Sequence, residues 1–90
     1  LAVELYQECE KLKLKNPVRD QLLRASLSIA LNIPEGSGRT SLKEQKLFYS
    51  IAMGSTREVQ CLIKTIKHKD LERRYDRLGA LVYGLTRISR

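Results

Sequence analysis

Hydrophobic residues recur every three or four positions along most of the chain, the spacing that places them on one face of an α-helix. Four residues near the start share such a face and predict a helix over residues 1–14: Ala2, Leu5, Cys9 and Leu12. Asn16-Pro17 ends this helix, because proline disfavours helical geometry in the residue before it. Proline suits a first helical turn, so a second helix is predicted from Pro17 or Val18 to the segment 36–38.

A third helix is predicted from Thr40 or Ser41 to Lys67, since Ser41 followed three residues later by Glu44 forms a capping box. Gly54 lies in its middle, where glycine is up to about 1 kcal/mol less favourable than alanine, which indicates a close backbone approach. A fourth helix is predicted from Asp70 to the end of the chain. Its apolar seam alternates steps of four and three residues: Leu71, Tyr75, Leu78, Val82 and Leu85.

The links between these helices are short, and short links make consecutive helices antiparallel neighbours. The pattern shows no internal repeat and no domain boundary. The predicted fold is therefore all-α, an antiparallel up-down four-helix bundle that forms a single domain over residues 1–90.

The second helix has two apolar faces. One face is suited to the bundle core: Val18, Leu22, Ala25, Ile29 and Ile33. The other face calls for a partner chain, because a helix that is apolar on two sides is seldom exposed in a monomer. This predicts a homo-oligomer whose interface includes Leu23, Leu27 and Leu31.

A narrow line of polar residues separates the two apolar faces of the second helix. The third helix has polar residues within its own apolar face. That apolar face consists of Phe48, Ile51, Ala52, Val59, Leu62, Ile63 and Ile66. Buried polar groups need partners, so a structural network is predicted. Its members are Arg24, Ser28, Asn32, Glu35, Arg39, Ser55 and Glu58. The alternative is a catalytic pair of Glu35 and Glu58, but acid–base catalysis needs a cleft for which a bundle of this size has little room. No catalytic residue is predicted.

The distribution of charged residues indicates nucleic acid as a candidate partner. The chain has 90 residues, with 17 Lys+Arg against 10 Asp+Glu and a net charge of +7. Five cations gather on the side of the third helix away from its apolar face: Lys43, Lys46, Arg57, Lys64 and Lys67. Such a stripe suits the phosphate backbone of RNA or DNA, although a solvated face is the plain alternative. Aromatic residues fall at core positions, so base stacking is not predicted.

The sequence contains no motif for binding a metal or a cofactor. Cys9 and Cys61 are isolated, and His68 is the sole histidine, so no zinc site and no cofactor are predicted. His68 is interpreted as solvent-facing or as a helix C-cap. Lone cysteines at helical positions indicate reduced thiols of a cytoplasmic protein, and no apolar run is long enough to span a membrane.

Three stretches resemble a known family: Gln21 to Ile29, Asn32 to Arg39, and Ile51 to Ser55 with Glu58. They are similar to the four-helix-bundle proteins encoded in intervening sequences of 23S ribosomal RNA. The match covers about half of the chain, while the outer helices agree only in length and periodicity. The sequence departs from the family by a short first link and by lacking residues that normally precede the first helix.

The resemblance implies a bacterial, non-enzymatic bundle that forms a ring-like homo-oligomer, a pentamer, with a basic surface. The family is also similar to accessory variability proteins of diversity-generating retroelements, which bind nucleic acid and a reverse transcriptase. A nucleic-acid enzyme is therefore an expected partner. The signature positions carried over are Arg24, Ser28, Asn32, Glu35, Gly36, Arg39, Gly54, Ser55 and Glu58.

Overall fold

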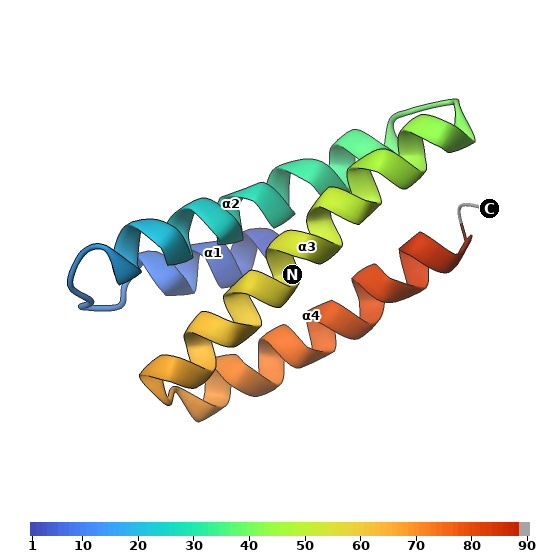
Figure 1. The fold of residues 1–90 in the computed structure, drawn as a ribbon. Coiled ribbons are helices and arrows are strands. Elements are labelled where there is room, and N and C mark those ends of the chain that lie inside the picture. The colour runs from blue at the N-terminus through green and yellow to red at the C-terminus, as the bar shows by residue number, and fades with distance from the viewer. Residues whose placement is uncertain (89–90) are drawn as a thin grey trace.

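The computed structural model describes residues 1–88, which form four helices and no strand. The helices are α1 (Ala2–Glu10), α2 (Val18–Ser37), α3 (Leu42–Ile66) and α4 (Lys69–Ile88). Each helix runs back beside its predecessor (Figure 1). The predicted all-α four-helix arrangement is confirmed. The last two residues of the predicted fourth helix, 89–90, lie outside the described part.

The helices pack in a cycle around one core. α2 packs along α3, α3 along α4, and α1 along α2, while α1 touches α4 more lightly. The connections are residues 11–17, 38–41 and 67–68, short enough to keep consecutive helices adjacent. Because α1 is much shorter than α2, it accompanies only part of that helix (Figure 1).

The first helix ends earlier than its periodicity predicts. α1 stops at Glu10, and Leu12 and Leu14 belong to the following connection, from which both pack half-buried against the core. The chain must reverse and reach Pro17, which favours extended geometry in the residue before it. Leu12 thus packs against the core as its place in the apolar pattern predicts, but without the helix.

The core takes its residues from the predicted faces of the helices. Leu5 and Cys9 of α1 are buried, as are Leu22, Ala25 and Ile29 of α2. α3 adds Tyr49, Ala52, Val59 and Ile63, and α4 adds Leu71, Tyr75, Leu78 and Val82. The predicted α4 seam is confirmed except at Leu85, which is half-buried. Ile51, predicted on the apolar face of α3, is instead exposed.

The ends of α3 show how local chemistry bounds the helices. Ser41 is the N-cap, and its side chain accepts a hydrogen bond of 3.4 Å from the backbone N–H of Glu44, as the capping box predicts. Lys67 closes the helix in the left-handed conformation, at φ 58° and ψ 38°. The chain then turns directly into α4.

His68 is half-buried and directly precedes α4, so its interpretation as a C-cap is wrong. Its Nδ1 accepts a hydrogen bond from the backbone N–H of Leu71 at 3.2 Å, and its carbonyl accepts from Glu72 at 2.9 Å. These are the contacts of an N-cap, which satisfies amide groups that the first helical turn leaves without partners. The sequence suggested a helix end at this point but not which end the histidine serves.

The sequence predicts that no apolar run is long enough to span a membrane. In the described part of the chain, no helix is both long and apolar enough to cross a bilayer.

Candidate nucleic-acid interface

The predicted basic residues lie on α3 and its C-cap with their side chains exposed. Lys43, Lys46, Arg57 and Lys64 share the outward side of α3, and Lys67 follows at its end. Within residues 1–88, none of the five forms an ion pair. Their charge is therefore open to a ligand in solution. These five residues are called the α3 stripe below.

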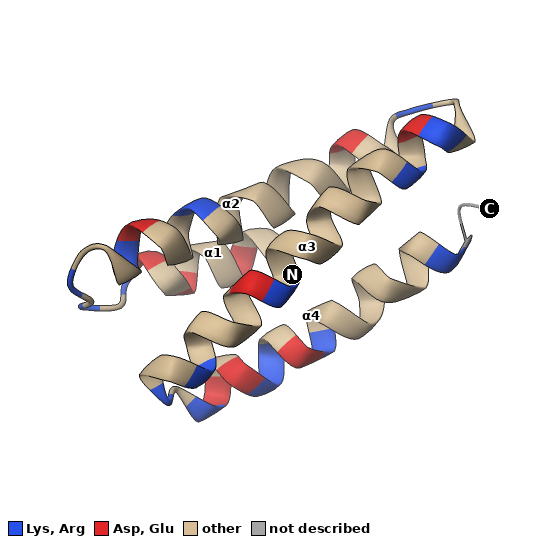
Figure 2. Cartoon of the chain, in the orientation of Figure 1, with Lys and Arg blue, Asp and Glu red and all other residues tan. Residues whose placement is uncertain are grey.

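The α3 stripe is interrupted along the helix, with its widest gap between Lys46 and Arg57. The eleven positions from Lys46 to Arg57 correspond to about 16 Å at a helical rise of 1.5 Å per residue. Figure 2 shows basic positions towards both ends of α3 and near its middle, with uncharged ribbon between. From Lys43 to Lys64 the stripe extends for about 31 Å, long enough to follow several phosphates of one backbone.

The cations of α4 contribute less to this field because carboxylates lie beside them. Arg73 and Arg74 reach Asp70 at 3.7 and 3.5 Å, and Lys69 reaches Glu72 at 3.7 Å. Facing α3, Asp76 accepts a hydrogen bond from Gln60 at 3.2 Å. Pairing thus partly offsets the positive charge at the start of α4, whereas the five cations of the α3 stripe have no such carboxylate partner among the described residues.

Only part of the predicted polar network comes together. Ser55 donates to Ser28 through their hydroxyls at 2.8 Å, and the Asn32 side chain donates to Ser28 at 3.1 Å. Asn32 also donates to the Ser28 carbonyl at 2.7 Å. The serines and the amide satisfy one another at the α2–α3 contact, so no buried carboxylate or cation is needed there.

The charged members of that network lie elsewhere. Glu35 forms an ion pair of 2.8 Å with Arg39 near the α2–α3 connection, and Arg39 also reaches Glu44 at 3.6 Å. The Arg39 guanidinium stacks over the Phe48 ring at 5.0 Å from its centre.

Arg24 and Glu58 are exposed. Neither side chain forms an ion pair within the described residues. The expectation of buried carboxylates is therefore wrong for both Glu35 and Glu58.

A buried polar cluster that the sequence analysis missed joins three helices. The Tyr75 hydroxyl lies 2.9 Å from the Ser26 hydroxyl and 3.4 Å from the Cys9 sulfur, and Ser26 donates to that sulfur at 3.6 Å. Ser26 follows Leu22 by four residues and so shares its core-facing side. This four-residue spacing was the feature of the sequence that could have predicted the burial of Ser26. Burial, with the Cys9 contact adding to it, raises the pKa of the Tyr75 hydroxyl well above its usual value near 10.

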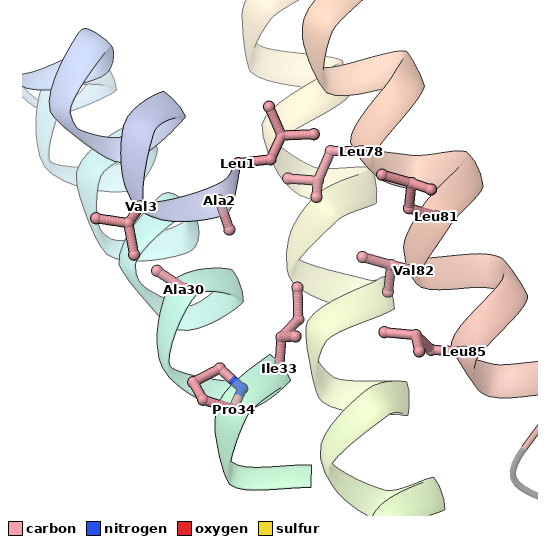
Figure 3. Close-up of a pocket in the computed structure, with 10 residues that line it drawn as sticks. All are labelled: Leu1, Ala2, Val3, Ala30, Ile33, Pro34, Leu78, Leu81, Val82 and Leu85. Atoms are coloured by element: carbon pink, nitrogen blue, oxygen red, sulfur yellow. The ribbon is translucent and has the colours of Figure 1, made fainter. Parts of the chain in front are cut away.

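One cavity of the structure is apolar. It has a volume of about 360 Å³ and opens between the start of α1 and the facing sides of α2 and α4 (Figure 3). Its lining carries no charged or titratable side chain: Leu1, Ala2, Val3, Ala30, Ile33, Pro34, Leu78, Leu81, Val82 and Leu85. Neither Glu35 nor Glu58 reaches it, so it offers the proposed catalytic pair no substrate cleft.

The predicted oligomer interface divides between core and surface. Leu27 and Leu31 are exposed on α2, as a surface for a partner requires, whereas Leu23 is half-buried and packs against the core. Among residues 1–88, no group of three or more His, Cys, Asp or Glu side chains is placed to hold a metal ion. Cys9 is buried and Cys61 exposed, and both are free thiols.

Comparison with known proteins places these observations in context. The family model described as 23S rRNA-intervening sequence protein matches residues 1–84, nearly the whole chain. No curated protein and no solved structure matches the sequence.

Proposed function

This chain belongs to the family of 23S rRNA-intervening sequence proteins, and we propose that it is a non-enzymatic protein that binds the backbone of RNA or DNA. The observation that carries the proposal is the α3 stripe, five exposed cations without an ion pair in the described chain. A cytoplasmic setting fits its two free thiols.

The mechanism is electrostatic. Lys43, Lys46, Arg57, Lys64 and Lys67 lie along one side of α3 and its C-cap, so a phosphate backbone following that helix meets several cations in turn. Each neutralised phosphate releases condensed counterions, which favours binding and makes it strongly salt-dependent. Such contacts read no base sequence.

Assembly would strengthen this binding. Several copies present several stripes, and linked weak contacts raise the overall affinity without any new contact. We propose a homo-oligomer, with a pentameric ring as the stoichiometry implied by the family resemblance. The resemblance to retroelement accessory proteins supports a nucleic-acid enzyme, such as a reverse transcriptase, as a further partner.

The second candidate is an oligomeric scaffold that binds no nucleic acid. The exposed side chains of Leu27 and Leu31 favour it, because apolar surface of this kind serves protein contacts. In that case the positive charge would serve solubility alone.

A charge-reversal series separates the two candidates. The triple variant K43E/K46E/K64E is compared with the control K11E/K13E/K15E, which makes the same change in net charge away from α3. Binding to fluorescent ribosomal-RNA fragments and to duplex DNA is measured by anisotropy at low and moderate salt. We expect the stripe variant to lose about tenfold or more in affinity relative to the control. Equal affinities for the two variants would reject the stripe as the binding surface.

A further inference from the structure

We infer that the face shared by α2 and α3 is the surface through which one copy of this chain binds a second copy. This inference rests on the homo-oligomer proposed above and identifies one of its contact surfaces, since each copy in a ring contacts its two neighbours through two different faces. The α2–α3 face is defined by six residues: Arg24, Leu31, Leu47, Ile51, Gly54 and Glu58.

The hydrogen bond between Ser28 and Ser55 sets the register of the two helices, at 2.8 Å. Because α2 and α3 run in opposite directions, Leu31 and Ile51 lie about one helical turn to one side of this bond (Figure 1). Arg24 and Glu58 lie about one turn to the other side. The face therefore has an apolar region at one end and a pair of opposite charges at the other.

The apolar region is open to solvent in the isolated chain. Leu31 is 56% exposed, Leu47 57% and Ile51 41%. The predicted apolar pattern of α3 included Ile51, yet the core does not use it. Large apolar side chains gathered on one surface are typical of a protein contact.

Gly54 gives an independent indication. It lies in the middle of α3, where glycine weakens a helix. Apart from its chain neighbours and the nearby backbone of α3 itself, no described atom lies within 4 Å of the Cβ that alanine would add. The close backbone approach predicted for this glycine therefore does not occur within the chain. An approach by another chain explains why a side chain is absent beside Leu47 and Ile51.

The charges of the face favour a second copy as the occupant. Arg24 and Glu58 supply one charge of each sign, and neither is ion-paired within the described residues. Two copies with a net charge of +7 repel each other unless they meet through a locally neutral face. The six residues of the face carry no net charge, and Arg24 and Glu58 can each meet an opposite charge on a neighbouring copy. A polyanion would instead prefer the α3 stripe, which lies on average about a quarter of a turn around the helix and adjoins the face where Lys43 and Lys46 line a hollow with Leu47.

The first test measures self-association by sedimentation velocity over a wide range of concentration. We expect the wild type to assemble and Ile51→Glu to weaken assembly about tenfold or more. Leu42→Glu is the control, since Leu42 is 52% exposed and begins α3 outside this face. Circular dichroism checks that both variants keep their helicity. Assembly unchanged in Ile51→Glu, or weakened equally in the control, would overturn the inference.

A glycine pair provides the second test. Gly54→Ala removes a helix-weakening residue, so on helical grounds alone it should only stabilise the protein. We expect it to weaken assembly while raising thermal stability of the monomer. Gly84→Ala is the control, because Gly84 of α4 also has open space around it. Assembly unaffected by Gly54→Ala would contradict a close approach at this site.

Neither test contains nucleic acid, so its outcome is separate from that of the binding experiment above. A wild type that stays monomeric would overturn the α2–α3 interface while leaving the α3 stripe intact as a binding surface. Conversely, assembly through this face without nucleic-acid binding would support the scaffold function.

Discussion

Two helical glycines of this chain have opposite surroundings. A Cβ added to Gly36 would lie 2.6 Å from Cε1 of Tyr49, whereas one added to Gly84 meets no atom within 4 Å. The Tyr49 ring is buried, and its hydroxyl lies 3.1 Å from that of Ser37, so it has little freedom to move aside. At the scale of single residues, the same substitution should therefore change stability in opposite directions.

We predict that Gly36→Ala destabilises the fold by about 1–3 kcal/mol, because the methyl group overpacks against Tyr49. Gly84→Ala should stabilise it by about 0.5–1 kcal/mol through helix propensity. Urea unfolding followed by circular dichroism measures both values. A stabilising Gly36→Ala would show that the ring and the helix separate at little cost.

The buried Tyr75 hydroxyl predicts a pH dependence. Its raised pKa means that the folded state keeps this proton at a pH where the unfolded state, with a pKa near 10, has lost it. Well below pH 10, the contribution of Tyr75 to the free energy of unfolding does not change with pH. Stability then falls as pH rises above 10, with a limiting slope of about 1.4 kcal/mol per pH unit.

Tyr75→Phe should lower stability by about 1 kcal/mol at neutral pH through loss of the Ser26 hydrogen bond. Its stability should also decline less above pH 10 than that of the wild type. Urea unfolding at a series of pH values compares the two proteins. Parallel profiles would mean that Tyr75 does not titrate differently in the folded and unfolded states.

At the scale of the helices, the short reversal between α3 and α4 depends on caps. Lys67 ends one helix in the left-handed conformation, and His68 caps the next by accepting a hydrogen bond from the Leu71 backbone N–H at 3.2 Å. Asp70 and Glu72 add favourable negative charge to the first turn of α4.

We predict that His68→Ala costs about 0.5–1 kcal/mol, because the first turn of α4 loses its side-chain acceptor. His68→Asn should keep most of the stability, since asparagine is among the best N-cap residues. Chemical unfolding of the three proteins side by side measures the effect. Equal losses for alanine and asparagine would point to packing of the imidazole rather than to the cap.

At the scale of the whole molecule, assembly and nucleic-acid binding should be coupled. If several α3 stripes of one oligomer contact the same strand, the slope of log affinity against log salt grows with the number of phosphates neutralised. We predict a shallower slope for Ile51→Glu than for the wild type at a concentration where only the wild type is assembled. Titrations at several salt concentrations give both slopes. Identical slopes would mean that one protomer makes all the phosphate contacts.

Periodicity was sufficient for the features that depend on one helix at a time. The positions of α2, α3 and α4, the α4 seam and the exposed α3 stripe follow from which side of a helix each residue occupies. A spacing of 3.6 residues per turn carries this information locally. The same rule would have placed Ser26 on the core side of α2, had its polar character not led away from that assignment.

Features that depend on two helices at once required the tertiary structure. The register of α2 against α3 joins Ser28 to Ser55 and leaves Glu58 exposed, although all three were candidates for one network. The early end of α1 and the open space at Gly54 are likewise set by where other segments pass. A sequence records which side of a helix a residue occupies, but the contacts on that side depend on how the helices pack against one another, which the spacing of residues does not specify.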